Sequence, residues 1–183
     1  MRFLTTLLAG ALAAPGLAAA PAVGAIGTRP PEWTVREWIG TAPMTLASLR
    51  GKVVVVRWWT GPDCPYCAGS VPVLDALWKE SRAQGLEVVG MYHHKSAAPL
   101  TRAHVVAERE RLGIAFPVAI DEDWKTLRRW WLDGRERAWT SVTLVLDRAG
   151  AICHVHRGGE IAEGSADAAA LRAAVETALR AAR

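Results

Sequence analysis

The chain has 183 residues and is 51% hydrophobic, which suffices for one well-packed domain and leaves no room for two sizeable ones. Its formal net charge of +4 comes from basic residues interleaved with acidic ones, which is typical of a solvated surface and excludes a long nucleic-acid-binding tract. Its three cysteines are too few for a scaffold stapled by disulfides. Composition therefore favours a single globular domain, without nucleic-acid partners, whose cysteines serve redox chemistry or metal binding.

The N-terminal segment has the layout of a secretory signal peptide. Arg2 gives a positive start, residues 3–12 form an apolar run, and small residues continue to Ala25. The run is shorter than the roughly 18 to 20 residues that a membrane span needs. The sequence predicts a signal peptide over residues 1–25, export to a periplasmic or extracytoplasmic compartment, and one domain over residues 26–183. Membrane anchoring is expected only if the N-terminal segment stays uncleaved.

The first half of that domain contains a buried strand followed by a helix. A short strand or cap is expected over residues 33–39. Residues 53–59 (VVVVRWW) predict a strand buried on both faces. A loop over residues 60–63 leads into a helix over residues 64–84, whose apolar residues recur at three- and four-residue spacing. Gly85 then stands where a helix C-terminal glycine is expected.

The second half continues the alternation of strands and helices. The predicted elements are a strand over residues 86–92, a helix over 101–112, a strand over 116–120, a helix over 124–131, a hairpin of strands over 140–146 and 151–156, and a helix over 167–180. Strands separated by helices, with a closing hairpin, predict the α/β class with a mixed central sheet.

Cys64 and Cys67 follow the buried strand and open the helix, and this placement carries the main functional prediction. The free N–H groups and the macrodipole at a helix N-terminus stabilise an anion. They can lower the pKa of a thiol from about 8.5 into the range of roughly 3.5 to 7.5. We therefore expect Cys64 to be the nucleophile and Cys67 the resolving cysteine. Pro65 and Tyr66 between them, and Trp59 before them, form the nearest surroundings of the pair.

Two other interpretations of the pair are a plain disulfide and part of a zinc site. A four-cysteine zinc site needs a second pair, whereas the chain offers only Cys153. Histidines, such as His93 and His94, could complete a set of four ligands. The placement between strand and helix favours redox chemistry, with no metal and no other cofactor.

Further segments match a known pattern around the cysteine motif. They are residues 49–55 and 58–60 before it, Pro72 five residues after it, and residues 116–118 and 144–150. Here the chain resembles the thioredoxin-like superfamily, specifically its exported TlpA/ResA-type (redoxin) branch, and residues 33–52 are also similar to the thioredoxin domain of some NHL-repeat proteins.

This resemblance implies a thioredoxin fold, in which helices flank a mixed central sheet behind an N-terminal extension. It also implies thiol:disulfide oxidoreductase activity on protein thiols and disulfides of exported proteins, with a membrane-bound or soluble thiol reductant upstream.

Three positions near the pair depart from the family pattern. Ser141, preceded by Thr140, stands where the family has a proline in cis facing the disulfide, and serine lacks the fixed geometry of proline. Ser70 replaces a glutamate, and Arg57 lies near the strand position of thioredoxin's buried aspartate. The last two changes remove a proton-accepting carboxylate near Cys67, so the redox potential and the partner do not carry over from the family.

Arg57 has two interpretations. A guanidinium near the pair would favour a thiolate and make the disulfide more oxidising. Alternatively, the side chain forms a salt bridge at a strand edge or extends outward into solvent.

Most of the nine tryptophans are expected in the core, while Trp59 and Trp139 are candidates to line a groove for a partner peptide. His93 and His94 follow a strand and are interpreted as ordinary loop residues. Cys153 is interpreted as a small buried apolar residue, on the strand face opposite the histidines at positions 154 and 156.

Two further functions compete with the oxidoreductase. A peroxiredoxin-like peroxidase would explain the missing proline, but Gly61 stands three residues before Cys64, where the peroxidase motif has threonine or serine, and Thr60 is one position off. A copper(I) chaperone could use both motif cysteines and a histidine, because soft thiolates suit copper(I). The sequence does not decide between reductant and oxidant.

Overall fold

The computed structural model describes residues 24–61, 64–134 and 139–181. Nearly all of the predicted signal peptide, residues 1–23, lies outside the described part, so that prediction remains an expectation.

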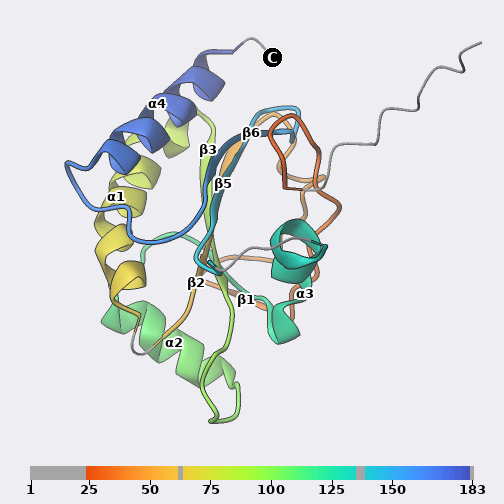
Figure 1. Cartoon of the computed structure of the whole chain (residues 1–183), viewed down its shortest axis with the longest axis vertical. Helices are drawn as coiled ribbons and strands as arrows, with labels where there is room; N and C mark the ends of the chain where they lie inside the picture. The colour runs from red at the N-terminus through yellow and green to blue at the C-terminus, as the bar shows by residue number, and fades with distance from the viewer. Residues whose placement is uncertain (1–23, 62–63, 135–138, 182–183) are drawn as a thin grey trace, which may run out of the picture.

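A six-stranded mixed sheet forms the centre of the molecule, with the strand order β1-β4-β3-β2-β5-β6 (Figure 1). The three inner strands β2, β3 and β4 are parallel, whereas β1, β5 and β6 each run antiparallel to their neighbours. This arrangement confirms the predicted fold class. The strands are β1 (Trp38–Ile39), β2 (Val53–Trp59), β3 (Leu86–Tyr92), β4 (Val118–Ile120), β5 (Thr143–Leu146) and β6 (Ile152–His156).

Helices cover both faces of the sheet unequally. Figure 1 shows α1 (Pro65–Ser81), α2 (Arg102–Arg111) and α4 (Ala166–Arg180) on one side, and the short α3 (Lys125–Leu127) on the other. The predicted helices over residues 64–84, 101–112 and 167–180 are therefore confirmed. A short 3-10 turn, η1 (Arg82–Gln84), ends the first of them, and Gly85 closes it with a φ of 97°, a left-handed conformation that glycine adopts without strain.

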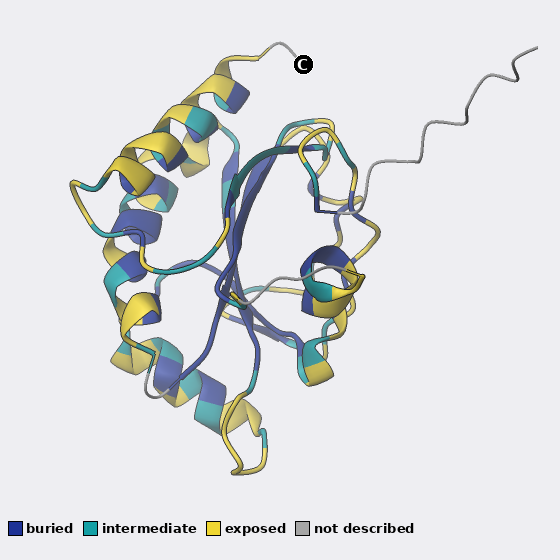
Figure 2. Ribbon diagram, in the orientation of Figure 1, coloured by how far each residue is buried: buried dark blue, intermediate teal, exposed yellow. Residues whose placement is uncertain are grey.

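Strand β2 is buried along its whole length, as Figure 2 shows for the centre of the sheet. Its side chains alternate between two apolar clusters, with Val55 and Trp59 packed beneath α1, and Val56 and Trp58 packed on the opposite face. The prediction of a doubly buried strand is confirmed. Because β2 leads directly into the cysteine motif, the motif is anchored on the most deeply buried strand.

The segment predicted as one helix over residues 124–131 is irregular. A 3-10 turn, η2 (Glu122–Trp124), precedes α3, and a wider turn, η3 (Arg128–Leu132), follows it. Asp123 and Trp124 have φ values of 55° and 59°, which interrupt a regular helix. The spacing of the apolar residues correctly predicted that this segment packs on the core, since Trp130 and Trp131 are buried. The two left-handed residues, however, break the helix at its start.

Three predicted strands are shorter than expected. Strand β4 begins at Val118 instead of residue 116. Strand β1 covers only the end of the segment 33–39. Strand β5 begins at Thr143 instead of residue 140, and the Ser141 carbonyl before it accepts a hydrogen bond from the Arg57 side chain.

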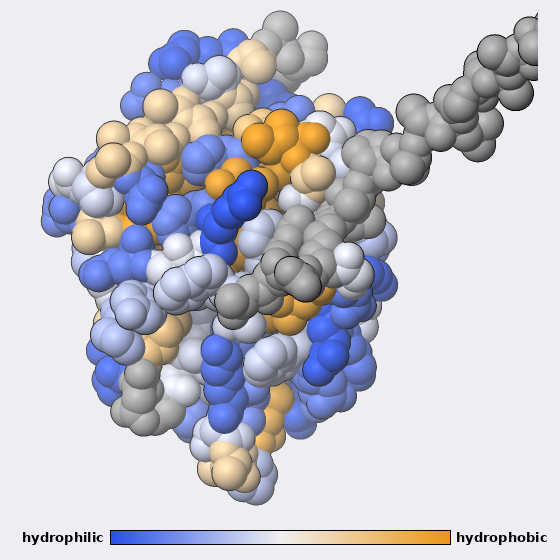
Figure 3. Space-filling view, viewed as in Figure 1, coloured by the Kyte–Doolittle hydropathy of each residue, from blue (hydrophilic) through white to orange (hydrophobic). Residues whose placement is uncertain are grey.

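The face of the molecule in Figure 3 is mostly hydrophilic, with apolar colour confined to limited areas. Among the described residues, no helix is long and apolar enough to cross a membrane.

Candidate redox site

Cys64 and Cys67 form a disulfide at the start of α1, with their Cα atoms 5.3 Å apart. Cys64 is the N-cap residue, in an extended conformation, and Pro65 occupies the first helical turn, where its missing N–H costs no hydrogen bond. The Cys67 N–H donates to the Cys64 carbonyl at 3.1 Å, which starts the helix between the two sulfurs. The first turn contains no acidic residue, so nothing there opposes the effect of the helix dipole on a Cys64 thiolate.

The two cysteines differ in access. Cys64 is half-buried, whereas Cys67 is 3% exposed. A groove of about 420 Å³ opens beside the nucleophile; it is lined by Thr60, Gly61, Cys64, Pro65, Tyr66, Lys95 and Ser96. A partner can therefore reach Cys64 and not Cys67, which matches the roles of nucleophile and resolving cysteine.

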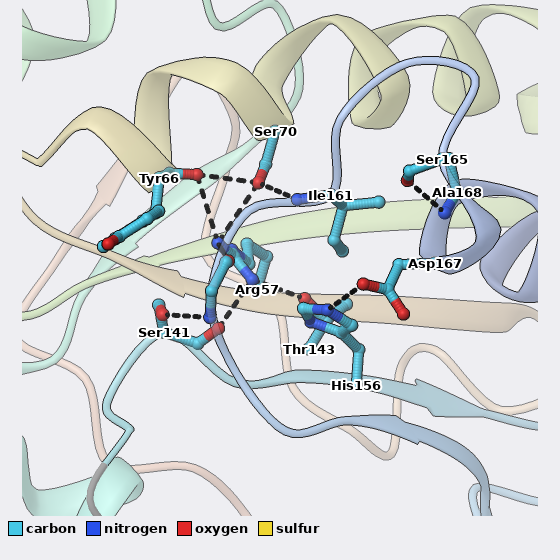
Figure 4. A network of polar contacts seen from close by, with 11 residues as sticks. Arg57, Tyr66, Ser70, Ser141, Thr143, His156, Ile161, Ser165, Asp167 and Ala168 are labelled. Carbon is cyan, nitrogen blue, oxygen red and sulfur yellow. Dashed lines mark hydrogen bonds and ion pairs between the residues drawn. The ribbon is translucent and has the colours of Figure 1, made fainter.

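Arg57 lies inside the protein beneath the motif, at 2% exposure, so its interpretation as an edge salt bridge or an outward-extending side chain is wrong. Its strand is covered on both faces, which leaves no route to solvent. Figure 4 shows its guanidinium at the centre of a network, where it donates to the carbonyls of Ser141 (2.6 Å), Gly159 (2.7 Å) and Tyr66 (3.4 Å) and to the hydroxyls of Thr143 (3.1 Å) and Ser70 (3.2 Å).

The three unusual positions of the sequence, Arg57, Ser70 and Ser141, belong to this one network. The Ser70 hydroxyl donates to the Tyr66 carbonyl at 2.8 Å and accepts from the Ile161 N–H at 2.9 Å. The Ser141 hydroxyl accepts from the Gly159 N–H at 3.1 Å. The network thus ties the first turn of α1 to the loop before β5 and to the loop after β6, and Thr140 lies half-buried at its margin.

Aromatic residues flank the motif on the outside and the inside. Tyr66 and Trp139 are 46% and 50% exposed, and their rings meet edge to face with centroids 6.0 Å apart. Trp59, by contrast, is 3% exposed, so the expectation that it lines a groove for a partner is wrong. It packs edge to face on Tyr92 at 5.0 Å because its strand position points into the core beneath α1.

His93 is not an ordinary loop residue, because it is 1% exposed. Its Nδ1 lies 2.8 Å from the Trp59 carbonyl. Burial, helped by the nearby charge of Lys95, lowers the pKa of His93 to about 3. The imidazole is therefore neutral at physiological pH, and its Nδ1–H donates to that carbonyl.

Tyr92 joins two histidines at the end of β3. Its hydroxyl lies 2.9 Å from His94 Nδ1 and 3.0 Å from His104 Nε2. Burial first, and then the charge of Glu108, raises the pKa of Tyr92 to about 12, so the phenol remains protonated. Sequence reasoning missed His104, because no spacing rule joins a residue of α2 to the end of β3.

Strand β6 carries the remaining candidates. His156 Nε2 lies 3.5 Å from Asp167 Oδ2, and burial lowers the pKa values of His154 and His156. Cys153 is half-buried, not buried as expected, because it lies on an edge strand that α4 covers only in part. Burial raises the pKa of its thiol, whose Sγ lies 3.4 Å from the Val145 carbonyl.

In the described part of the chain, potential metal ligands do not cluster. Within residues 24–61, 64–134 and 139–181, no group of three or more histidine, cysteine, aspartate or glutamate side chains is arranged to hold a metal ion.

A central sheet of this order, with a disulfide of C-x-x-C spacing at the N-terminus of the helix after β2, defines a thioredoxin-fold dithiol protein. The comparisons with known proteins agree. The chain belongs to the Redoxin family, whose model matches residues 37–173.

Two bacterial proteins illustrate the relatives that this chain matches. Protein DipZ of Mycobacterium tuberculosis is 30% identical over 135 residues, which are 72% of this chain and 19% of DipZ. ResA, a thiol-disulfide oxidoreductase of Halalkalibacterium halodurans, is 28% identical over 114 residues, which are 62% of this chain and 58% of ResA. The chain thus matches only about a fifth of the length of DipZ.

A solved structure of a thiol-disulfide isomerase from Corynebacterium glutamicum shares the fold, with a TM-score of 0.64 and 23% identity. The match covers 87% of this chain and 98% of the isomerase. The predicted resemblance to redoxins and the predicted thioredoxin fold are therefore confirmed.

Proposed function

We propose that this chain is a thiol:disulfide oxidoreductase that exchanges disulfides with cysteines of exported proteins. One observation carries the proposal: the disulfide at the start of α1 has a half-buried sulfur beside an open groove and a second sulfur buried beneath it. The names of ResA and of the isomerase from Corynebacterium glutamicum support the same activity.

The exchange follows from the access of the two sulfurs. A thiolate of the partner attacks Cys64 Sγ, the Cys64–Cys67 bond breaks, and its electron pair remains on Cys67. A second thiolate of the partner then displaces Cys64, so the partner leaves with a disulfide and the protein is reduced. In the reverse direction, the Cys64 thiolate attacks a partner disulfide and Cys67 resolves the mixed disulfide.

The surroundings of the groove suit a polypeptide partner. Tyr66 and Trp139 present exposed aromatic edges next to Cys64, and aromatic residues are enriched at sites of protein recognition. Lys95 adds a positive charge to the groove, which favours approach of a partner thiolate.

Exchange of Cys64 and Cys67 for serine tests the proposal. We expect Cys64→Ser to abolish insulin reduction and thiol oxidation, because no other thiol lies at the groove. We expect Cys67→Ser to accumulate mixed disulfides through Cys64, visible on non-reducing gels. Cys153→Ser is the matched control and keeps full activity, since its sulfur lies on β6. Full activity of Cys64→Ser would refute the proposed function.

The two alternative functions find less support at the site. For a peroxidase, the Thr60 hydroxyl would have to contact the attacking Cys64 sulfur, but it donates to the Gly61 carbonyl at 3.4 Å instead. For a copper chaperone, the described residues provide no third ligand beside the pair. Reaction of Cys64 with peroxide at the rate of a free thiol, and failure to retain copper(I) in anaerobic titration, are the expected results.

We propose further that the protein is exported after cleavage of a signal peptide within residues 1–25, and that a membrane-bound or soluble thiol protein resets its redox state. N-terminal sequencing of the protein from the extracytoplasmic fraction should give a first residue near position 21 or 26. Recovery of the protein only from the cytoplasm would contradict export.

A further inference from the structure

A small cavity lies directly behind Cys67. Its volume is about 10 Å³, and Arg57, Trp59 and Cys67 line it together with apolar side chains of α1 and of residues 112–116. This volume is at the lower limit for a single water molecule. Cys67 is the one acidic group among the residues that line it.

Two side chains of the cavity wall have N–H groups without an acceptor. They are Arg57 Nε and Trp59 Nε1, on side chains that are 2% and 3% exposed. A buried donor without an acceptor destabilises a folded protein, so two unpaired donors beside one cavity are unusual.

Glycine at position 90 leaves space beside one of these donors, the Trp59 indole nitrogen. Gly90 pairs with Arg57 across β2 and β3. A Cβ atom at Gly90 would lie 2.9 Å from Trp59 Nε1 and 3.0 Å from the Phe116 ring. The indole nitrogen therefore lies over the strand position directly beside Arg57.

Arg57 is also a buried cation without a counter-charge. All five of its hydrogen-bond acceptors are neutral oxygens, and it forms no ion pair with a described carboxylate. Burial lowers the pKa of Arg57 only to about 10, so the charge persists at neutral pH. A buried charge is costly unless an opposite charge approaches it.

We propose that Arg57 and Trp59 form a thiolate-binding hole that holds Cys67 as an anion in the reduced protein. The proposal deepens the proposed function and rests on its disulfide exchange. When a partner thiolate attacks Cys64, the electron pair of the broken S–S bond stays on Cys67, and the new thiolate accepts hydrogen bonds from Arg57 Nε–H and Trp59 Nε1–H without transfer of a proton. A better-stabilised thiolate leaves faster, so the site favours oxidation of partner dithiols.

Other charged groups near the network would modulate the effect. His156 on β6 interacts electrostatically with Arg57 and pairs with Asp167 of α4. Glu108 of α2 faces Gly61, and Glu160 lies over Gly69 of α1. His93, directly after β3, is neutral above pH 5, so it adds no charge in the range where the thiol titrates.

The test isolates Cys67 as the single thiol of the full chain, in the double variant Cys64→Ser, Cys153→Ala. Thiolate absorbance at 240 nm, followed across pH, reports its pKa directly. We expect a pKa below about 7, against the ordinary value of about 8.5. A value at or above about 8.5 overturns the proposal, because burial alone would raise it.

Two further substitutions in this double variant test whether Arg57 and Trp59 are the donors to the Cys67 thiolate. We expect Arg57→Met to raise the pKa of Cys67 by about two units and Trp59→Phe by about one unit, because each removes a donor and the first removes the charge. Trp58→Phe is the matched control: its indole donates to Asp121 on the opposite face of the sheet and should leave the pKa unchanged.

Near-ultraviolet circular dichroism shows whether each variant is folded. If Arg57→Met does not fold, the test rests on Trp59→Phe alone. An unchanged pKa of Cys67 in that variant overturns the proposed thiolate-binding hole. The titration needs no redox partner. A low pKa in a protein without exchange activity would therefore refute the proposed function and leave the hole in place.

Discussion

Burial makes His93 a source of pH-dependent stability. Its imidazole is neutral in the folded protein because its pKa falls to about 3, whereas in the unfolded chain it takes up a proton near pH 6.5. The folded state therefore binds fewer protons between these values, and its stability falls as the pH drops below 6.5. His154 and His156 act in the same direction, since burial lowers their pKa values as well.

We predict that His93 contributes a loss of about 2 kcal/mol in unfolding free energy between pH 7 and pH 5. Urea denaturation at the two pH values measures this loss. His93→Asn keeps a donor for the Trp59 carbonyl but removes the titrating ring, so it should show a loss smaller by that amount. An equal loss in both proteins would show that His93 is protonated in the fold.

For single residues, the sequence correctly predicted that Cys64 and Cys67 lie at the start of a helix, because the order of strand, cysteine and helix is a local feature. It could not choose between the two interpretations of Arg57, because the acceptors of the guanidinium come from residues as far away as Gly159. Trp59 was misjudged for a related reason: nearness in sequence to the motif does not tell which face of β2 a side chain occupies.

Among the elements, the irregular segment around α3 is attached to the sheet by one carboxylate. Asp121, directly after β4, accepts from the Trp58 indole (2.9 Å) and from the N–H groups of Thr126 and Leu127 (2.8 Å each). It thereby caps α3 and joins it to β2. This contact explains why the segment turns where it does in place of continuing as the regular helix that its tryptophan spacing predicted.

We predict that Asp121→Ala lowers the unfolding free energy by about 3 kcal/mol or more, because it leaves three buried N–H donors unpaired. Urea denaturation measures the loss. The combination with Trp58→Phe should cost less than the sum of the two single changes, since they share a contact. A loss below about 1 kcal/mol for Asp121→Ala would show that the carboxylate does not hold α3.

Strand β3 depends on the missing side chain at Gly90. We predict that Gly90→Ala destabilises the protein by about 1–3 kcal/mol, because the added methyl meets Trp59 and Phe116. Thermal unfolding checks this value. Phe116→Leu in the same chain should recover part of the loss by making room, and a stable Gly90→Ala single variant would contradict the close approach of the two rings.

For the whole molecule, the alternation of apolar patterns predicted the fold class and the long elements, and the structure confirms them. It could not predict the long-range polar contacts, such as Tyr92 with His104, since side-chain networks depend on how elements pack.

Residues just after the proposed leader also take part in the fold: the Gly27 N–H donates to the Ile152 carbonyl and the Ile152 N–H to the Thr28 carbonyl. They cover the outer edge of β6.

The reduction potential of the Cys64–Cys67 pair distinguishes a redox-active pair from a structural disulfide. Equilibration of the purified protein in glutathione redox buffers, followed by thiol labelling, measures it. We predict one two-electron transition between about −270 and −120 mV, toward the oxidising end if Arg57 stabilises the Cys67 thiolate. A pair that remains oxidised in buffers poised below about −300 mV would behave as a structural disulfide and contradict the account.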